Sequence, residues 1–182
     1  EWEARWNPQW LSQIGVRSET VKMDTGTVQG YKSTGTVYPP DANAFNAKDR
    51  SRTDNNWDLS ALARYTPDTS KTYEFGYARK TRSPNLYERY TWSTGGMAMN
   101  MINMVGDGNG YVGNLDLKPE VAHTLSATAD WHDNEQSWGL KVTPYYTLVE
   151  DYINAKRCGP SDTSATGSAC STTNLSGDNK FV

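Results

Sequence analysis

Four of the chain's 5 methionines fall in one short stretch, at Met97, Met99, Met101 and Met104. Their thioether sulfurs are soft ligands that select Cu(I) over hard cations. An extended backbone puts alternate methionines on one face, and a helix does the same for those three or four positions apart. We interpret the group as a candidate soft-metal contact. The alternative is that these adaptable apolar side chains pack a loop onto its neighbours.

Arginines and tyrosines are mixed just before the methionine group, and among them Arg82, Tyr87 and Arg89 are candidate ligand-binding residues. Guanidinium groups bind anions through paired hydrogen bonds, and aromatic rings offer stacking surfaces, which suits an anionic siderophore. The alternative, which we favour, is that the arginines of this region form ion pairs with its glutamates, Glu74, Glu88 and Glu120.

The two cysteines, Cys158 and Cys170, lie in one polar segment rich in serine, threonine and glycine. We predict a disulfide between them, which would indicate an oxidising compartment. Free thiols or a metal pair are the alternatives, although no nearby cysteine or histidine completes a zinc site. His123 and His132 have no nucleophile placed by a motif, so we expect a protein that is not an enzyme.

Apolar and polar residues alternate along most of the chain, as in residues 57–66, 73–78, 124–131 and 138–143. This period of two predicts strands with one apolar and one polar face, and helical periodicity hardly occurs. Pro144 interrupts the sixth predicted strand, and we interpret it as a bulge or as the strand's exit from a membrane.

Short and long connections alternate between the predicted strands. The short ones are residues 7–9, 67–70 and 133–136, and the long ones are residues 24–55, 82–119 and 154–179. Antiparallel strands place alternate connections at opposite ends of a sheet, so one end carries tight turns and the other carries long loops. This asymmetry is typical of outer-membrane β-barrels.

Aromatic residues flank each short connection, as Trp6 with Trp10, Tyr65 with Tyr73, and Trp131 with Trp138. Such rings favour a membrane interface, so they predict an aromatic girdle at one membrane face. The alternative is a soluble β-sandwich, such as a carbohydrate-binding or adhesin-like module that uses Trp and Tyr for sugar stacking. The formal net charge of -3 gives no basic footprint for nucleic acid.

Two motifs resemble those of a known family. Tyr77–Glu88, which contains the sequence Pro-Asn-Leu-Tyr-Glu, resembles a segment of TonB-dependent outer-membrane receptors, and Asn114–Glu120 resembles the motif that follows it. The resemblance extends to residues 149–153 and the cysteine loop. Residues 90–99 and 106–111 are most similar to the branch of TonB-dependent copper receptors.

The resemblance implies a 22-stranded transmembrane barrel in the outer membrane of a Gram-negative bacterium, with short periplasmic turns and long extracellular loops. Residues 1–182 would form about seven strands of it, an all-β antiparallel meander. A plug domain and the segment that contacts the TonB complex would lie in N-terminal parts outside this chain. The implied partners are outer-membrane lipid, the remaining barrel strands and the TonB complex.

The implied function is TonB-dependent uptake of a metal, with copper ion as the transported ligand and no covalently bound cofactor. The alternative within the family is a ferric-siderophore receptor. The copper branch is expected to carry Cys-x-x-x-Met and His-x-Met ligands, and this sequence contains neither. The principal metal site therefore cannot be assigned to residues of this chain.

Overall fold

The computed structural model describes residues 1–182 except 30–31, 34–35, 38, 93–109, 136 and 158–177. The chain divides into two compact units, each described here by itself. The first comprises Glu1–Thr20, Asn55–Arg82 and Pro119–Tyr152. The second comprises Val21–Asp54, Ser83–Lys118 and Ile153–Val182.

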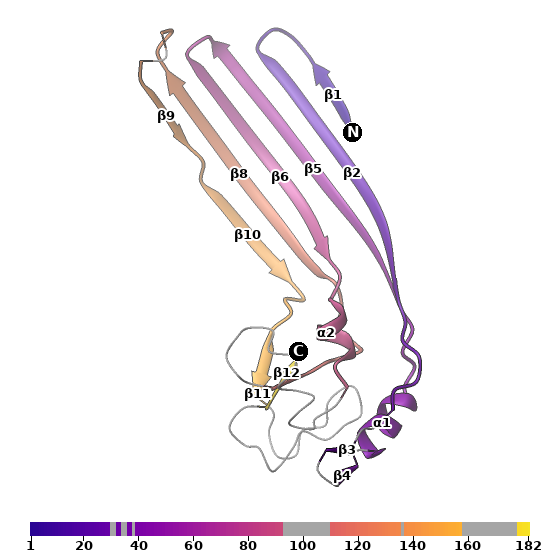
Figure 1. The fold of residues 1–182 in the computed structure, drawn as a ribbon. Helices are drawn as coiled ribbons and strands as arrows, with labels where there is room; N and C mark the ends of the chain where they lie inside the picture. The colour runs from indigo at the N-terminus through magenta and orange to yellow at the C-terminus, as the bar shows by residue number, and fades with distance from the viewer. Residues whose placement is uncertain (30–31, 34–35, 38, 93–109, 136, 158–177) are drawn as a thin grey trace. The chain divides into compact units, whose positions relative to one another are not determined.

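The main sheet is an antiparallel meander (Figure 1). Its strands are β1 (Trp2–Arg5), β2 (Trp10–Met23), β5 (Arg52–Asp68), β6 (Lys71–Arg82), β8 (Glu120–His132), β9 (Gly139–Val142) and β10 (Tyr145–Glu150). They form one seven-stranded sheet in the order β1-β2-β5-β6-β8-β10, with β9 also paired to β8. The prediction of an antiparallel meander of about seven strands is confirmed.

The interruption predicted at Pro144 separates β9 from β10. Both strands pair with β8, β9 with its C-terminal part and β10 with its N-terminal part. Proline has no N–H to donate to a ladder. Its carbonyl still accepts from the Ala127 N–H at 3.1 Å, so β9 and β10 occupy one strand position with a break at residues 143–144.

Three tight turns lie at one end of the sheet, joining β1 to β2, β5 to β6 and β8 to β9. Short polar side chains close them by accepting backbone N–H bonds. The Asn7 side chain accepts from Gln9 and Trp10, each at 2.9 Å. The Asp133 carboxylate accepts from the Ser137 hydroxyl and the Trp138 N–H, and the Ser137 bond holds the pKa of Asp133 below its ordinary value.

The second unit contains short elements that the alternation did not predict. They are β3 (Lys32–Ser33), β4 (Thr36–Val37), α1 (Pro39–Asn46), α2 (Leu86–Tyr90), β7 (Gly110–Val112), β11 (Ala155–Arg157) and β12 (Asp178–Phe181). A three-stranded sheet has the order β11-β12-β7, and β12 pairs with β7 in parallel. This is the one departure from antiparallel pairing among the described strands. β7 and β12 belong to different long connections, so no tight turn between them requires antiparallel pairing.

A small apolar core includes residues of this second sheet. It consists of Tyr111, Leu117, Ile153 and Phe181, which are each buried. The rings of Tyr111 and Phe181 lie with their centroids 5.6 Å apart. None of the helices in the described residues is long and apolar enough to cross a membrane.

Candidate functional site

One face of the main sheet is polar, and its side chains pair across strands. Arg64 Nε lies 2.6 Å from Glu74 Oε1, and the Gln13 amide donates to Glu3 at 2.6 Å. Two threonine pairs continue the pattern between β8 and the last strand position, Thr124 with Thr147 at 2.9 Å and Thr128 with Thr143 at 3.0 Å. Cross-strand pairs of this kind stabilise a sheet.

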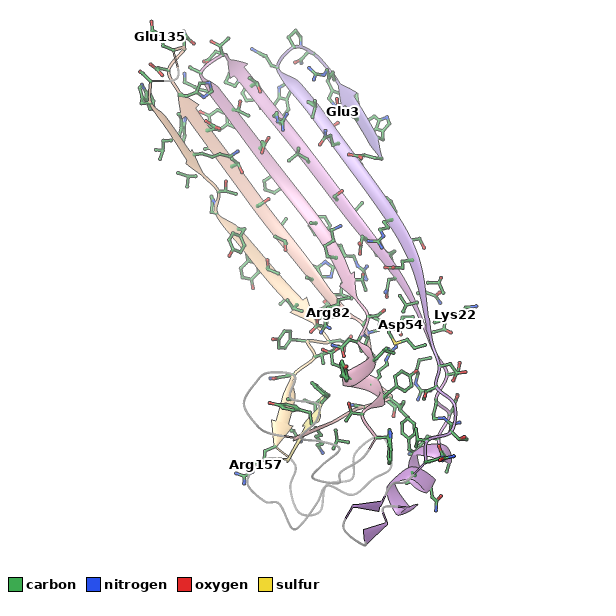
Figure 2. The ribbon with its side chains drawn as sticks, viewed as in Figure 1. Glu3, Lys22, Asp54, Arg82, Glu135 and Arg157 are labelled. Carbon is green, nitrogen blue, oxygen red and sulfur yellow. The ribbon has the colours of Figure 1, made fainter. Side chains whose placement is uncertain are left out.

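The opposite face of the same sheet is apolar and exposed. Phe75, Leu125 and Leu148 are 59%, 47% and 51% exposed. Side chains along a strand alternate between the two faces of the sheet, and Figure 2 draws them on every strand of it. So much apolar surface facing outward along a whole sheet marks a surface that contacts another apolar medium. With a polar opposite face, it has the pattern of a barrel wall between lipid and lumen.

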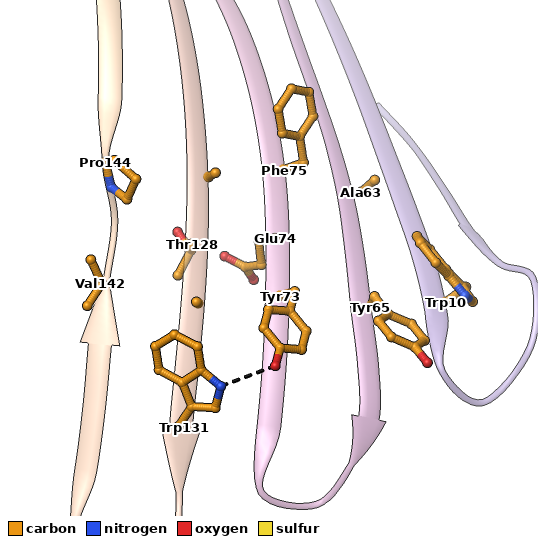
Figure 3. A pocket seen from close by; sticks show the side chains of 12 residues that line it. Trp10, Ala63, Tyr65, Tyr73, Glu74, Phe75, Thr128, Trp131, Val142 and Pro144 are labelled. Carbon is orange, nitrogen blue, oxygen red and sulfur yellow. Dashed lines mark hydrogen bonds between the residues drawn. The ribbon is translucent and has the colours of Figure 1, made fainter.

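A row of aromatic rings crosses this apolar face near the tight turns (Figure 3). Trp10 stacks on Tyr65 with centroids 4.7 Å apart, and Tyr65 lies 6.5 Å from Tyr73. Tyr73 meets Trp131 edge to face at 6.1 Å and accepts a hydrogen bond from its indole N–H at 3.1 Å. The row therefore runs over β2, β5, β6 and β8. Amphipathic rings at one level are expected at a membrane interface.

The same rings border a hollow in the apolar face. Three alanines line the hollow with their small side chains, Ala63 on β5 and Ala127 and Ala129 on β8. Phe75, Val142 and Pro144 also line it, as do Glu74 and Thr128. Four of the six residues of the predicted aromatic girdle, Trp10, Tyr65, Tyr73 and Trp131, thus form one row across β2, β5, β6 and β8. Trp6 instead contacts Trp2, with ring centroids 6.2 Å apart.

In the second unit, Arg89 holds together segments from different connections. Its guanidinium is 1% exposed and donates to both carboxylate oxygens of Asp54, each at 2.8 Å. It also donates to the Leu117 carbonyl at 2.8 Å. Paired charge-assisted bonds of this kind fix both distance and orientation. Arg89 is therefore a positioning residue in this structure, with its donors on Nη1 and Nη2 directed at protein groups.

The two sequence motifs meet at this point. The Asn114 N–H donates to the Glu88 carbonyl at 2.8 Å, and the Gly113 N–H donates to the Thr91 carbonyl at 2.8 Å. A Cβ on Gly113 would lie 2.7 Å from the Arg89 carbonyl oxygen, so only glycine fits this approach. The motif around α2 and the motif Asn114–Glu120 form one packed structure.

Helix α2 has its own start signal, a capping box. Asn85 caps its N-terminus, because the Asn85 side chain accepts from the Glu88 N–H at 2.8 Å while the Glu88 carboxylate accepts from the Asn85 N–H at 2.7 Å. Next along the helix, the Tyr90 hydroxyl donates to the Arg50 carbonyl at 2.8 Å. Burial raises the pKa of Tyr90, which keeps it a donor.

A second arginine closes the same region from β5. Arg52 donates through Nε to the Leu115 carbonyl at 2.8 Å and through Nη2 to the Asp116 carboxylate at 3.0 Å. Arg52 and Arg89 thus bind neighbouring parts of the segment after β7. Sequence reasoning missed Asp54 and Arg52, because neither lies in a motif and their partners are far away in the chain.

The structure places the predicted site residues in different environments. Arg82 pairs with Glu120 at 2.6 Å, which confirms the favoured ion-pair interpretation for that residue. Tyr87 is 55% exposed. Glu74 pairs with Arg64 on β5, so the arginine partner expected for Glu74 was wrong. Glu88 caps α2, and Arg89 pairs with Asp54. A ligand contact for Arg82, Tyr87 or Arg89 stays a prediction, and the buried guanidinium of Arg89 gives it no support.

Two predicted groups lie outside the described residues. They are the methionines Met97, Met99, Met101 and Met104 and the cysteines Cys158 and Cys170. The soft-metal contact and the disulfide both stay predictions. Within the described part of the chain, no group of three or more His, Cys, Asp or Glu side chains is placed to hold a metal ion.

A two-faced antiparallel meander with tight turns at one end, long connections from the other and an aromatic row defines the wall of an outer-membrane type of β-barrel. The family model described as TonB dependent receptor-like, beta-barrel, matches residues 1–180, and the chain belongs to this family. Neither the curated proteins nor the solved structures contain a match to the chain. The family consists of transporters rather than enzymes, and it replaces the soluble sugar-binding module as an interpretation.

Proposed function

We propose that this chain forms part of the barrel of an outer-membrane receptor for TonB-dependent uptake of a metal, with copper as the cargo. The barrel would have 22 strands and would lie in the outer membrane of a Gram-negative bacterium. A plug domain and the TonB contact would be supplied by other parts of the protein. The observation that carries the receptor function is family membership over residues 1–180 together with the two-faced sheet.

The cargo rests on the methionine group. Met97, Met99, Met101 and Met104 belong to the connection between β6 and β8, one of those that leave the sheet opposite the tight turns. Long loops of such barrels face the cell exterior. Thioethers there would capture Cu(I) weakly, because neutral ligands bring no charge, and would pass it inward.

Replacing all four methionines with leucine tests the cargo, because volume and apolar character stay nearly constant. The variant receptor in its native length should fold and insert normally, yet import copper several-fold more slowly when copper is scarce. Zinc import should not change. Met23→Leu shows what loss of a packing thioether does, since Met23 lies on β2 outside the group and its sulfur accepts from Arg89 Nη1 at 3.6 Å. Copper import at the parent rate by the quadruple variant would show that these methionines only pack.

The alternative cargo within the family is a ferric siderophore. It is favoured by the exposed ring of Tyr87 and by the remaining exposure of Arg82, whose side chain is 47% exposed despite its ion pair. The same cells distinguish the two cargoes. Replacing Tyr87 with alanine should slow ferric-siderophore import only if that is the cargo, and copper import should then be indifferent to the methionines.

A further inference from the structure

The apolar face carries one cation that has no carboxylate partner. Arg79 lies on β6, and its cross-strand partners in the register are Leu59 on β5 and His123 on β8. Leu148 on β10 continues the row beyond His123. Leucines on both sides of this row place the Arg79 side chain on the apolar face. A charged group there is costly unless something compensates it.

The contacts of Arg79 satisfy only part of its donor capacity. Its guanidinium lies over the Trp57 ring, 3.8 Å from the centroid. Nη1 donates to the Trp57 carbonyl and, at 3.0 Å, to the Thr81 hydroxyl. Among the described residues, no carboxylate lies within ion-pair distance of the Arg79 guanidinium. Its Nε and Nη2 groups donate to no acceptor there. Glu150, the nearest acid on this face by register, lies on β10 beyond β8.

A second polar pair lies directly beside this cation. The Tyr77 hydroxyl and His123 Nδ1 are 2.8 Å apart, and the two rings stack with centroids at 6.2 Å. If the hydroxyl donates to Nδ1, the proton of the imidazole is on Nε2 and is free to donate. Arg79 and His123 face each other across the strand pair, where Cβ atoms are about 5 Å apart. Several donors therefore gather on a surface that is otherwise apolar.

This cluster lies at the depth where lipid headgroups are expected. Eight residues separate Trp131 in the aromatic row from His123 along β8, which is about 27 Å at 3.4 Å per residue. A strand tilt of about 40° reduces this to a depth of about 20 Å, close to the roughly 25 Å height of the apolar band in such barrels. The aromatic row is at the tight-turn end, so the cluster lies near the opposite interface.

We propose that Arg79, with the Tyr77–His123 pair, forms a site on the lipid-facing wall for the anionic phosphate headgroup of a membrane lipid. The phosphate would accept from Nε and Nη2 of Arg79 and from the imidazole of His123, and the acyl chains would lie on the leucines and Phe75 below. The positive charge on an apolar surface selects a ligand that is anionic at one end and apolar at the other. The proposal depends on the membrane-barrel assignment and not on the identity of the cargo.

The experiment measures lipid retained by the native-length receptor purified in uncharged detergent. Dioleoylphosphatidic acid is titrated and the bound lipid is counted by native mass spectrometry. Dioleoylglycerol, which has the same chains without phosphate, is the comparison lipid. The parent receptor should bind dioleoylphosphatidic acid at least tenfold more tightly than dioleoylglycerol, which is the gain expected from a pair of charge-assisted hydrogen bonds. Equal binding of the two lipids overturns the proposal without any variant.

The substitution Arg79→Gln should lower the affinity for phosphatidic acid about tenfold or more. Arg79→Lys should lower the affinity less, because the charge remains. Arg17→Gln is the matched control, since Arg17 pairs with Glu19 on the polar face. Unchanged affinity in a correctly folded Arg79→Gln receptor contradicts the site. Glycerol 3-phosphate distinguishes the source: if it displaces the lipid at equal concentration, the ligand is a free phosphate and the lipid assignment fails. Metal import should stay normal in Arg79→Gln, which separates this test from that of the cargo.

Discussion

The buried pair of Asp54 and Arg89 makes the sharpest prediction, because removing one charge leaves the other without its partner. In Asp54→Asn the side chain keeps its shape and one acceptor oxygen. The Arg89 guanidinium, 1% exposed, would then be buried beside a neutral amide, with the Leu117 carbonyl as its other oxygen acceptor and the Met23 sulfur 3.6 Å from Nη1. Breaking a buried pair costs about 3–5 kcal/mol. The surviving acceptor places this change near the lower end, at about 3 kcal/mol.

That free energy is lost locally, where α2 meets the segment after β7. Amide hydrogen exchange of the native-length receptor in detergent reports such local opening. About 3 kcal/mol corresponds to roughly 150-fold faster exchange at the Asn114 and Leu117 amides. Exchange at the β6–β8 ladder should stay at the parent rate, because that ladder belongs to the first unit.

Asp116→Asn is the matched control for this experiment. It also removes a carboxylate from an arginine, Arg52, but the Asp116 side chain is 71% exposed. An exposed pair contributes at most about 1 kcal/mol, so exchange should rise less than about fivefold. If Asp54→Asn and Asp116→Asn raise exchange equally, the buried pair does not hold this region together and the argument from burial is refuted.

Two further predictions concern the backbone and a turn. Gly113→Ala would place a methyl group 2.7 Å from the Arg89 carbonyl oxygen and 2.8 Å from the Thr91 nitrogen, so we expect a local loss of about 1–3 kcal/mol, visible as faster exchange at Asn114. Asp133 has its pKa lowered chiefly by the Ser137 hydroxyl, so its contribution to the turn is present above the unfolded value near 3.8 and is lost as the pH falls through the folded pKa. An NMR titration of the Asp133 carboxylate should give a midpoint below 3.8, which Ser137→Ala should raise toward it.

The strands and tight turns could be predicted from sequence because the information is local. A period of two in polarity, with turn residues such as Asn7 and Asp133, specifies a strand's faces and its end. The predicted long connection from Arg82 to Pro119 agrees closely with the end of β6 at Arg82 and the start of β8 at Glu120. Even the break at Pro144 follows from one missing donor.

The contacts between the long connections could not be predicted, because the residues that make them are distant in sequence. Asp54 lies on β5 and Arg89 lies on α2, and the alternation of polar and apolar residues does not predict that they pair. Arg89 was a candidate for ligand binding on the evidence of residue type alone. Residue type describes what a guanidinium can bind, whereas burial decides which of its possible partners it reaches.

The packed motifs have a consequence for the methionine group between them. Thr91 and Gly113 are joined by a backbone hydrogen bond, so the chain between α2 and β7 starts and ends at neighbouring points. Fixing the ends of a connection in advance removes the closure entropy that a ligand would otherwise have to overcome. If Met97–Met104 capture a metal, we therefore expect the buried pair of Asp54 and Arg89 to contribute to that capture by holding the ends of the connection. A receptor with Asp54→Asn should need more copper for half-maximal import than its parent, while Asp116→Asn should not, because only the first loosens both ends of that connection.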